Sequence, residues 1–209
     1  MTDIMPTVSV LSGRVRTPNM DEYRKLKRML NYVKCTMADH LVVRINKGFN
    51  VAKWYADAAF AVHPDFKLHS GGRLLLSDKG DTVVSMSQKQ KLNTRSSTEA
   101  ELVGVDDVIG KLMWVQEFLE EQGFGMGTIT LFQDNRSAIL LETKGKVAST
   151  KRTRHINIRY FHVLDLVEHN RLKIEYAGTQ DMVADFFTKP LQGTAFSRFK
   201  SIILGQRGL

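Results

Sequence analysis

Four carboxylates lie at positions where apolar neighbours make an unpaired charge costly. Asp57 falls inside WYADAAFAV and Asp185 inside DMVADFFTK, while Glu101 falls in SSTEAEL at a helix start and Asp134 directly follows the strand-like TITLFQ. A buried carboxylate needs a cation or hydrogen-bond donors beside it. Carboxylates gathered from separate elements are the ligands that a hard divalent cation such as Mg²⁺ prefers. The four acids together therefore favour a divalent metal site.

Taken singly, each acid also has an ordinary structural interpretation. Asp57 fits an edge strand on which its side chain faces water, and Asp185 fits the exposed face of a helix. Asp134 precedes a predicted helix, where aspartate is a favoured N-cap. Glu101 fits the edge of an apolar stripe, with its carboxylate reaching solvent. Only the combination of all four points to metal chemistry.

Two glutamates near the start of one predicted helix have different expected roles. Ser96 and Glu99 have the spacing of a capping box, which gives Glu99 a local structural role. Glu101 lacks such a role, and helical spacing places it with Val105 and Leu112 on or beside the buried stripe. Glu101 is therefore the better catalytic candidate, and we expect Glu99 to face solvent or the helix N-terminus.

The elements that must position these acids follow a mixed α/β pattern. Alternation and turn residues predict strands over 52–62, 72–76, 82–86, 128–133 and 171–176. Helical spacing predicts helices over 21–35, 96–121, 135–141, 154–169 and 181–188, the last ending before Pro190. This order predicts a mixed five-stranded sheet flanked by helices, whose first three strands form an antiparallel meander.

Composition sets the class of protein. The chain has 209 residues, of which 43% are hydrophobic and 25% charged, values typical of a globular protein with one sizeable core. No run approaches the roughly 20 apolar residues of a membrane helix, and the N-terminus does not resemble a signal peptide. A single cysteine, Cys35, excludes a disulfide framework and a multi-cysteine zinc site, and it favours a reducing compartment.

Basic residues are in excess, with a net charge of +8. The stretch 144–159 holds six basic residues and no acid. Such a run is either a solvated loop and helix start or an edge that binds phosphates. On the second interpretation Lys151, Arg152 and Arg154 are the candidate nucleic-acid contacts.

Several segments resemble one known family. They are YADAAFA, SSTEAEL, LFQDNRSAI, KRTRHINIRYFHV and VADFFTKPL. These are similar to the ribonuclease H domain at the C-terminal end of copia-type LTR retrotransposon Pol polyproteins. The earlier segment RVRTPNMDEYRKLKRMLNYVKCT resembles the thumb or connection stretch between the reverse transcriptase and that domain. The resemblance covers residues 17–205 but not the reverse-transcriptase palm, so the chain looks like the end of a larger protein.

The resemblance implies an RNase H-like fold over residues 51–209, after an N-terminal helical connection segment over residues 1–50. It matches the family's four-carboxylate site to Asp57, Glu101, Asp134 and Asp185, which would bind two Mg²⁺ or Mn²⁺ ions. The implied activity is hydrolysis of the RNA strand of RNA–DNA hybrids during reverse transcription. The implied partner is the polymerase domain absent from this chain, and the implied location is a cytoplasmic virus-like particle or the nucleus, with no membrane contact.

One departure keeps other functions open. Cellular type 1 ribonucleases H carry a histidine in the loop before the last acid, and here that loop, residues 177–180, has none. Proton transfer or product release is then expected to be slower or to use another group. An inert remnant that holds hybrid without cutting it is the main alternative, because intact carboxylates do not by themselves show that the domain is active. A transposase or integrase is a weaker one, because retroelement integrases usually add a His/Cys zinc module that a single cysteine does not allow.

A separate prediction concerns the structure of the first fifty residues. The predicted helix over 21–35 presents Tyr23, Leu26, Leu30 and Val33 on one side among basic residues. A helix of about fifteen residues is marginal alone in water, so it needs a partner surface. We expect this helix to dock partially on the rest of the chain and to serve as a connection. Residues 1–19 show no clear periodicity, and we expect them to be extended or loosely ordered.

Overall fold

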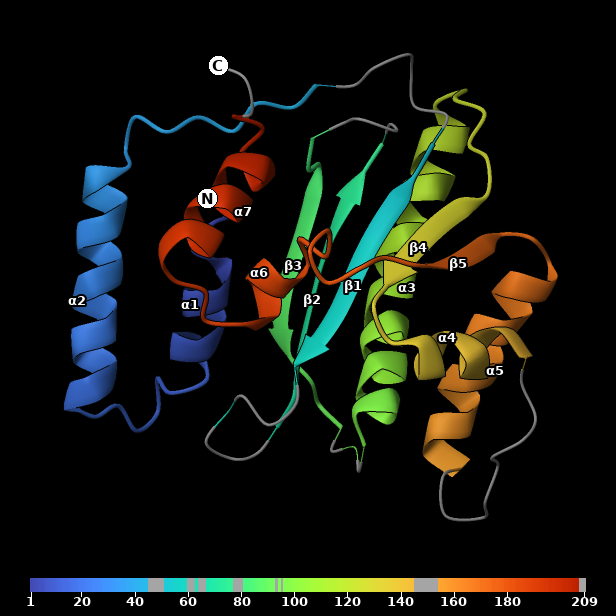
Figure 1. Cartoon of the computed structure of the whole chain (residues 1–209), viewed down its shortest axis with the longest axis horizontal. Helices are drawn as coiled ribbons and strands as arrows, with labels where there is room; N and C mark the ends of the chain where they lie inside the picture. The colour runs from blue at the N-terminus through green and yellow to red at the C-terminus, as the bar shows by residue number, and fades with distance from the viewer. Residues whose placement is uncertain are drawn as a thin grey trace.

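A five-stranded mixed sheet forms the centre of the computed structural model (Figure 1). Its strands are β1 (Lys53–Ala59), β2 (His69–Leu75), β3 (Val84–Lys89), β4 (Ile129–Gln133) and β5 (Leu172–Tyr176). The strand order is β3-β2-β1-β4-β5, in which β1 pairs antiparallel with β2 and parallel with β4. The β2–β3 pair is antiparallel and the β4–β5 pair is parallel. The predicted mixed five-stranded sheet with its antiparallel meander is therefore confirmed.

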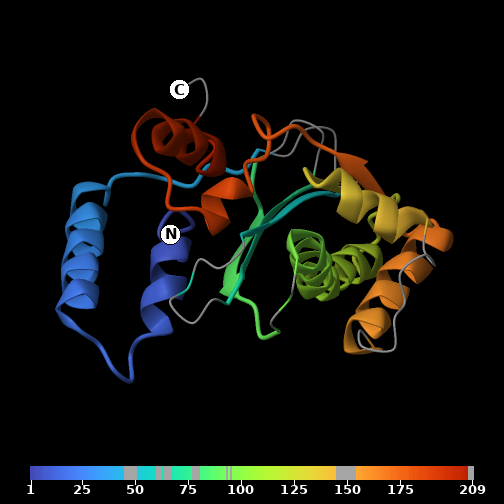
Figure 2. The same ribbon diagram turned by 60° about the horizontal axis from the view of Figure 1, so that its bottom comes forward.

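The structure describes residues 1–44, 51–59, 63, 67–76, 81–92, 94, 96–144 and 154–206. Its helices are α1 (Met5–Ser12), α2 (Met20–Cys35), α3 (Ser97–Glu121), α4 (Arg136–Lys144), α5 (Arg154–Glu168), α6 (Asp185–Thr188) and α7 (Gly193–Ile203). Figures 1 and 2 show α3 on one face of the sheet and α6 on the other, with α2 at the periphery. Among the helices of these residues, none has the length and apolar character needed to span a bilayer.

The long helix α3 lies in the main core. Ser96 caps it, because the Ser96 Oγ accepts a hydrogen bond from the backbone N–H of Glu99 at 3.2 Å. Val105 and Leu112 are buried against the sheet residues Trp54 and Leu131, as the helical stripe predicted. Burying this stripe stabilises the helix more than its intrinsic propensity does.

The short helix α6 approaches the opposite face of the sheet very closely. It packs at Gly71, the β2 residue paired with Asp57 on β1. A Cβ atom at Gly71 would lie 2.6 Å from Thr188 Cγ2 and 2.7 Å from Phe187 Cβ, distances that real Cβ atoms do not reach. Glycine at this position therefore allows α6 to carry Thr188 against the centre of the sheet.

Two helices were not predicted. Met5–Ser12 form α1, so the expectation of extended or loose structure over residues 1–19 was wrong for this segment. The helix α1 lacks a strong amphipathic pattern, and its contacts with β3 and α6 stabilise it instead. The expectation of a final helix before Pro190 was also wrong, because α7 follows and buries Phe199, Ile202 and Ile203. The predicted helix over 181–188 is shorter, since only Asp185–Thr188 are helical.

The helix α2 has a regular N-terminal cap, but few of its side chains are removed from solvent. Asn19 and Glu22 form a capping box, in which the Asn19 Oδ1 accepts from the Glu22 N–H and the Glu22 Oε2 accepts from the Asn19 N–H. Its Tyr32 hydroxyl donates to Asp3, and the Tyr32 ring meets Phe196 of α7 edge-on. None of its residues is fully buried. Three members of its apolar stripe remain well exposed: Tyr23, Leu26 and Leu30. The helix is thus partially docked, whereas the domain boundary at residue 50 stays a prediction.

Candidate active site

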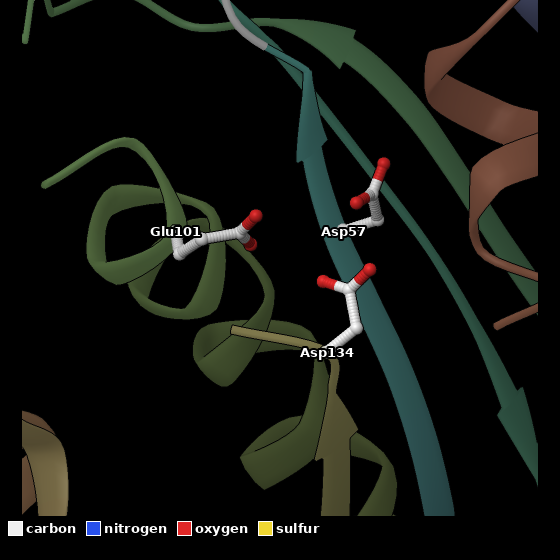
Figure 3. A group of neighbouring side chains, drawn as sticks. All are labelled: Asp57, Glu101 and Asp134. Carbon is white, nitrogen blue, oxygen red and sulfur yellow. The ribbon is translucent and has the colours of Figure 1, made fainter. Parts of the chain in front are cut away.

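Three of the four predicted acids converge at one place on the sheet. Asp57 lies on the central strand β1, Glu101 in the second turn of α3, and Asp134 directly after β4, the parallel neighbour of β1. One carboxylate oxygen from each residue lies within 4.8 Å of those of the other two. Figure 3 shows the three side chains pointing toward a common space from three different elements. The arrangement has the oxygen donors that a divalent cation requires.

Asp134 is available for this cluster because another residue caps the following helix. The Asn135 Oδ1 accepts hydrogen bonds from the backbone N–H groups of Ser137 and Ala138, both at 3.1 Å. Asn135 is therefore the cap of α4, and the interpretation of Asp134 as that cap was wrong. The Asp134 carboxylate points toward Asp57 and Glu101 (Figure 3).

Asp57 is buried in the middle of the sheet, with only 3% of its surface exposed, so the edge-strand interpretation was also wrong. The Thr188 hydroxyl donates a hydrogen bond to Asp57 Oδ2, and Lys189 Nζ lies 3.6 Å from Asp57 Oδ1. Burial raises the pKa of Asp57 to about 6, although Lys189 and the Thr188 hydroxyl oppose the shift. The carboxylate is therefore held in an environment that favours a nearby cation.

Glu101 is buried on α3, as its spacing predicted, and not at a solvent-exposed edge of the stripe. Burial raises the pKa of Glu101 well above its usual range, and the neighbouring acids Asp57, Asp134 and Glu142 raise it further. Like charges this close disfavour one another's ionised forms. A divalent cation would relieve that repulsion, so the donor set fits Mg²⁺ or Mn²⁺.

Asp185 is close to the cluster but makes a different contact. It is buried at the start of α6, and its Oδ1 accepts a hydrogen bond from Lys189 Nζ at 2.7 Å. The same Nζ is the group next to Asp57, so Lys189 lies between the two acids. Burial raises the pKa of Asp185, and the pairing with Lys189 counteracts part of that shift. The joint catalytic and metal-binding role of all four acids stays a prediction.

A second buried pair lies behind the cluster and was missed in the sequence. Gln133 and Glu142 are both fully buried, and the Gln133 Nε2 donates a hydrogen bond to Glu142 Oε2. Burial raises the pKa of Glu142 to about 8, although this hydrogen bond lowers it. The predicted helix stopped at Leu141, so Glu142 was left outside it. Glu142 lies four residues after the buried Ala138, and this helical spacing was the signal for its burial.

Buried histidines connect the sheet to α6. His63 Nε2 lies 2.9 Å from His69 Nδ1, and His69 Nε2 lies 2.8 Å from the Ser87 Oγ. That hydroxyl donates to the backbone carbonyl of Phe187 at 2.8 Å. Burial and the neighbouring His63 lower the pKa of His69 to about 4, so the His69 ring is neutral at physiological pH. The chain of contacts fixes the α6 backbone that carries Asp185.

The predicted nucleic-acid contacts lie mostly outside the part of the chain that the structure describes. Lys151 and Arg152 lie outside the described residues, and Arg154 begins α5 with its side chain outside them. The predicted role of these three residues stays a prediction.

Comparison with known proteins places this site in a family context. No family model matches the chain. It is 28% identical over 201 residues to the retrovirus-related Pol polyprotein from transposon TNT 1-94 of Nicotiana tabacum, covering 96% of this chain and 15% of that protein. It is 32% identical over 200 residues to the Pol polyprotein from transposon RE2 of Arabidopsis thaliana, covering 94% and 13%. Its homologues are retrovirus-related Pol polyproteins. The resemblance in the sequence motifs is thus confirmed, and the chain spans about a seventh of the length of these Pol polyproteins.

Solved structures similar to this Pol-related chain include ribonucleases H. The LC11 ribonuclease H1 in complex with an RNA/DNA hybrid is 14% identical, with a TM-score of 0.49, and the match covers 66% of this chain and 93% of that one. The foamy viral protease-reverse transcriptase in complex with double-stranded DNA is 17% identical, with a TM-score of 0.46 and coverage of 66% and 92%. Both are likenesses of fold.

Proposed function

We propose that this chain is the ribonuclease H part of a retrotransposon Pol polyprotein and that it hydrolyses the RNA strand of RNA–DNA hybrids. The observation that carries the proposal is the convergence of Asp57, Glu101 and Asp134, within 4.8 Å of one another, from three separate elements. The negative charges of buried acids in such a cluster repel one another unless a bound cation neutralises them. The similarity to Pol polyproteins over nearly the whole chain supports the same function.

The chemistry proposed for the site is metal-dependent. Asp57, Glu101 and Asp134 would hold Mg²⁺ or Mn²⁺, and Asp185 would complete the set for a second ion. Such ions, when bound, supply an activated water and stabilise the leaving 3′ oxygen. The chain's own contribution is to bring the carboxylates together on rigid elements. The central strand and α3 provide that rigidity because both lie in the main core.

The proposed substrate is an RNA–DNA hybrid. A structural relative was solved in complex with an RNA/DNA hybrid. The net charge of +8 and the basic run over 144–159 suit a polyanion. Ribose 2′-hydroxyl groups would distinguish the RNA strand from the DNA strand. The proposed partner is the polymerase domain of the polyprotein, and the proposed location is a cytoplasmic virus-like particle or the nucleus.

Two observations favour a second candidate, a remnant that binds hybrid without cutting it. Lys189 is ion-paired with the Asp185 carboxylate, and the loop over 177–180 lacks a histidine. If Asp185 stays ion-paired with Lys189 when substrate binds, the site would hold the hybrid but hydrolyse it poorly. The two candidates differ in cleavage and agree in binding, so both properties must be measured on the same sample.

The experiment uses a hybrid labelled on its RNA strand and the full chain. Binding is measured by fluorescence anisotropy in EDTA, and Mg²⁺ is then added and the RNA products are separated on a gel. We expect the wild-type chain to bind and cut, and Asp134→Asn to bind without cutting. Binding without cutting by the wild type would support the remnant. Cutting by Asp134→Asn at the wild-type rate would show that the activity does not come from this site.

A further inference from the structure

The ammonium group of Lys189 contacts two of the proposed metal ligands, Asp57 and Asp185. Its Nζ lies 2.7 Å from Asp185 Oδ1 and 3.6 Å from Asp57 Oδ1. The lysine directly follows α6, and its backbone N–H donates to the Asp185 carbonyl at 2.9 Å. The ammonium group therefore sits where two acids from different elements face each other. Both acids are buried, with 3% of Asp57 and 7% of Asp185 exposed.

The three-carboxylate cluster and the Lys189 ion pair share one residue, Asp57. Asp57 belongs to the cluster with Glu101 and Asp134, and it is also the residue that Lys189 approaches. A divalent ion between Asp57 and Asp185 and the ammonium group of Lys189 would occupy the same region with charges of the same sign. The two cations would therefore exclude each other from it.

We propose that the Lys189 ammonium is a resident counter-ion that competes with a divalent ion for Asp57 and Asp185. The site then loads in order, first at Asp57, Glu101 and Asp134, and at the Asp185 side only when Lys189 withdraws. This inference rests on the proposed function, because it assigns an order to the same metal site. Lys189 acts here as a positioning residue, since it acts through the carboxylates.

The surroundings of Lys189 leave its side chain room to move. Thirty-nine per cent of its side chain is exposed, and a lysine ammonium sits on a flexible four-carbon stem. Lys189 also lines a cavity of about 650 Å³ between α6, the segment that leads to α7, and the N-terminal helices α1 and α2. An ammonium that leaves the two acids would move toward this cavity or toward solvent. A phosphate of the bound nucleic acid would be a suitable new partner.

The test measures metal binding without nucleic acid and without turnover. Mn²⁺ is titrated into the metal-free full chain by isothermal calorimetry, for wild type, Lys189→Gln and Lys189→Arg. We expect two binding events of unequal affinity in the wild type. Removing the competing charge in Lys189→Gln should strengthen the weaker event about tenfold, whereas Lys189→Arg keeps the charge and should behave like the wild type.

A matched control removes a lysine from a similar ion pair far from the site. Lys173 on β5 lies 2.6 Å from Glu175, and its side chain is exposed. Lys173→Gln should leave both Mn²⁺ affinities unchanged. Equal affinities in wild type and Lys189→Gln would overturn the inference and leave the proposed function intact. Absence of Mn²⁺ binding from both chains would overturn the proposed function and the inference with it.

A second measurement follows Lys189 in the wild-type chain, in case Lys189→Gln does not fold. Lysine side chains are labelled by reductive ¹³C-methylation, and the Lys189 resonance is identified by its loss in Lys189→Arg. Mg²⁺ should shift this resonance in step with the weaker binding event, because the ammonium group leaves its carboxylates. A resonance that stays fixed while Mg²⁺ saturates the site would overturn the inference.

Discussion

The two sides of the site are built differently. Asp57, Glu101 and Asp134 lie on or beside β1, α3 and β4, which share the main core of the protein. Asp185 lies on α6, a helix of 4 residues that is held by its packing on the sheet and on α7. Three acids on long elements meet one another, while the acid on the short helix meets a lysine. The packing of the supporting elements thus separates a cluster of three acids from a fourth acid that is paired with a lysine.

Glu101→Gln should have the largest effect, because it removes a proposed metal ligand from the cluster of three acids. Cleavage of the hybrid should fall by more than about a hundredfold, since even groups one step removed from a metal contribute about 10- to 100-fold. Single-turnover kinetics measure this loss. Glu99→Gln is the matched control, because Glu99 lies in the same first turns and offers its backbone N–H to the Ser96 cap. Similar losses in both variants would contradict the assignment of Glu101.

Asp185→Asn should reduce cleavage less than Glu101→Gln does. Asp185 is paired with Lys189 and lies outside the cluster whose oxygens meet within 4.8 Å. The expected loss is about 10- to 100-fold, with the stronger Mn²⁺ binding event preserved. Kinetics and calorimetry on the same preparation check both parts. Loss of all Mn²⁺ binding would show that the two sides of the site form one unit.

Gly71→Ala should separate α6 from the sheet. The new Cβ would lie 2.6 Å from Thr188 Cγ2, so the helix must shift. Overpacking of this kind costs about 1–3 kcal/mol of unfolding free energy, which urea denaturation measures. Gly110→Ala is the control, because Gly110 is exposed in α3 with nothing within 4 Å of the added Cβ. That change should stabilise the chain by about 0.5–1 kcal/mol. Equal stabilities of the two variants would contradict the close packing of α6.

Glu142→Gln should have the smallest effect at about pH 5, where the folded chain holds Glu142 neutral like a glutamine, and the effect should grow as the pH rises. The pKa of Glu142 is raised to about 8 in the folded chain, so the folded chain holds a proton that the unfolded chain releases. Its stabilising contribution is full below the pKa of the unfolded state and is lost as the pH rises toward 8. The wild type should therefore lose up to about 1.4 kcal/mol per pH unit over this range through this group.

Urea denaturation at about pH 5 and about pH 8 measures that difference. Asp57 and Glu101 contribute with the same sign, so the comparison is between the pH slopes of wild type and Glu142→Gln. The variant should have the shallower slope. Identical slopes would show that Glu142 does not retain its proton in the folded chain.

The sequence predicted the cluster of three acids better than the surroundings of the fourth acid. Periodicity placed Glu101 on a buried stripe, and the strand pattern placed Asp134 at the end of a strand, because both depend on regular elements. The Lys189 contact depends on a three-dimensional approach of α6 to the sheet that Gly71 permits. No local pattern encodes that approach.

The missed elements have the same physical explanation. The helix α1 depends on contacts with β3 and α6, which are distant in the sequence. Pro190 suggested the end of the final helix, yet a further helix, α7, follows, and its apolar residues Phe199 and Ile203 pack against Phe186 and Phe187. Glu142 was placed outside its helix by a boundary error of a few residues, which is common at helix ends.

Anomalous X-ray diffraction from Mn²⁺-soaked crystals of the wild-type chain tests the central claim most directly, because it locates the metal itself. The account predicts a strong peak within coordinating distance of the Asp57, Glu101 and Asp134 carboxylates, and loss of that peak in Asp134→Asn. A wild-type map without a peak at these three side chains, from crystals soaked at saturating Mn²⁺, would contradict a metal-dependent ribonuclease site.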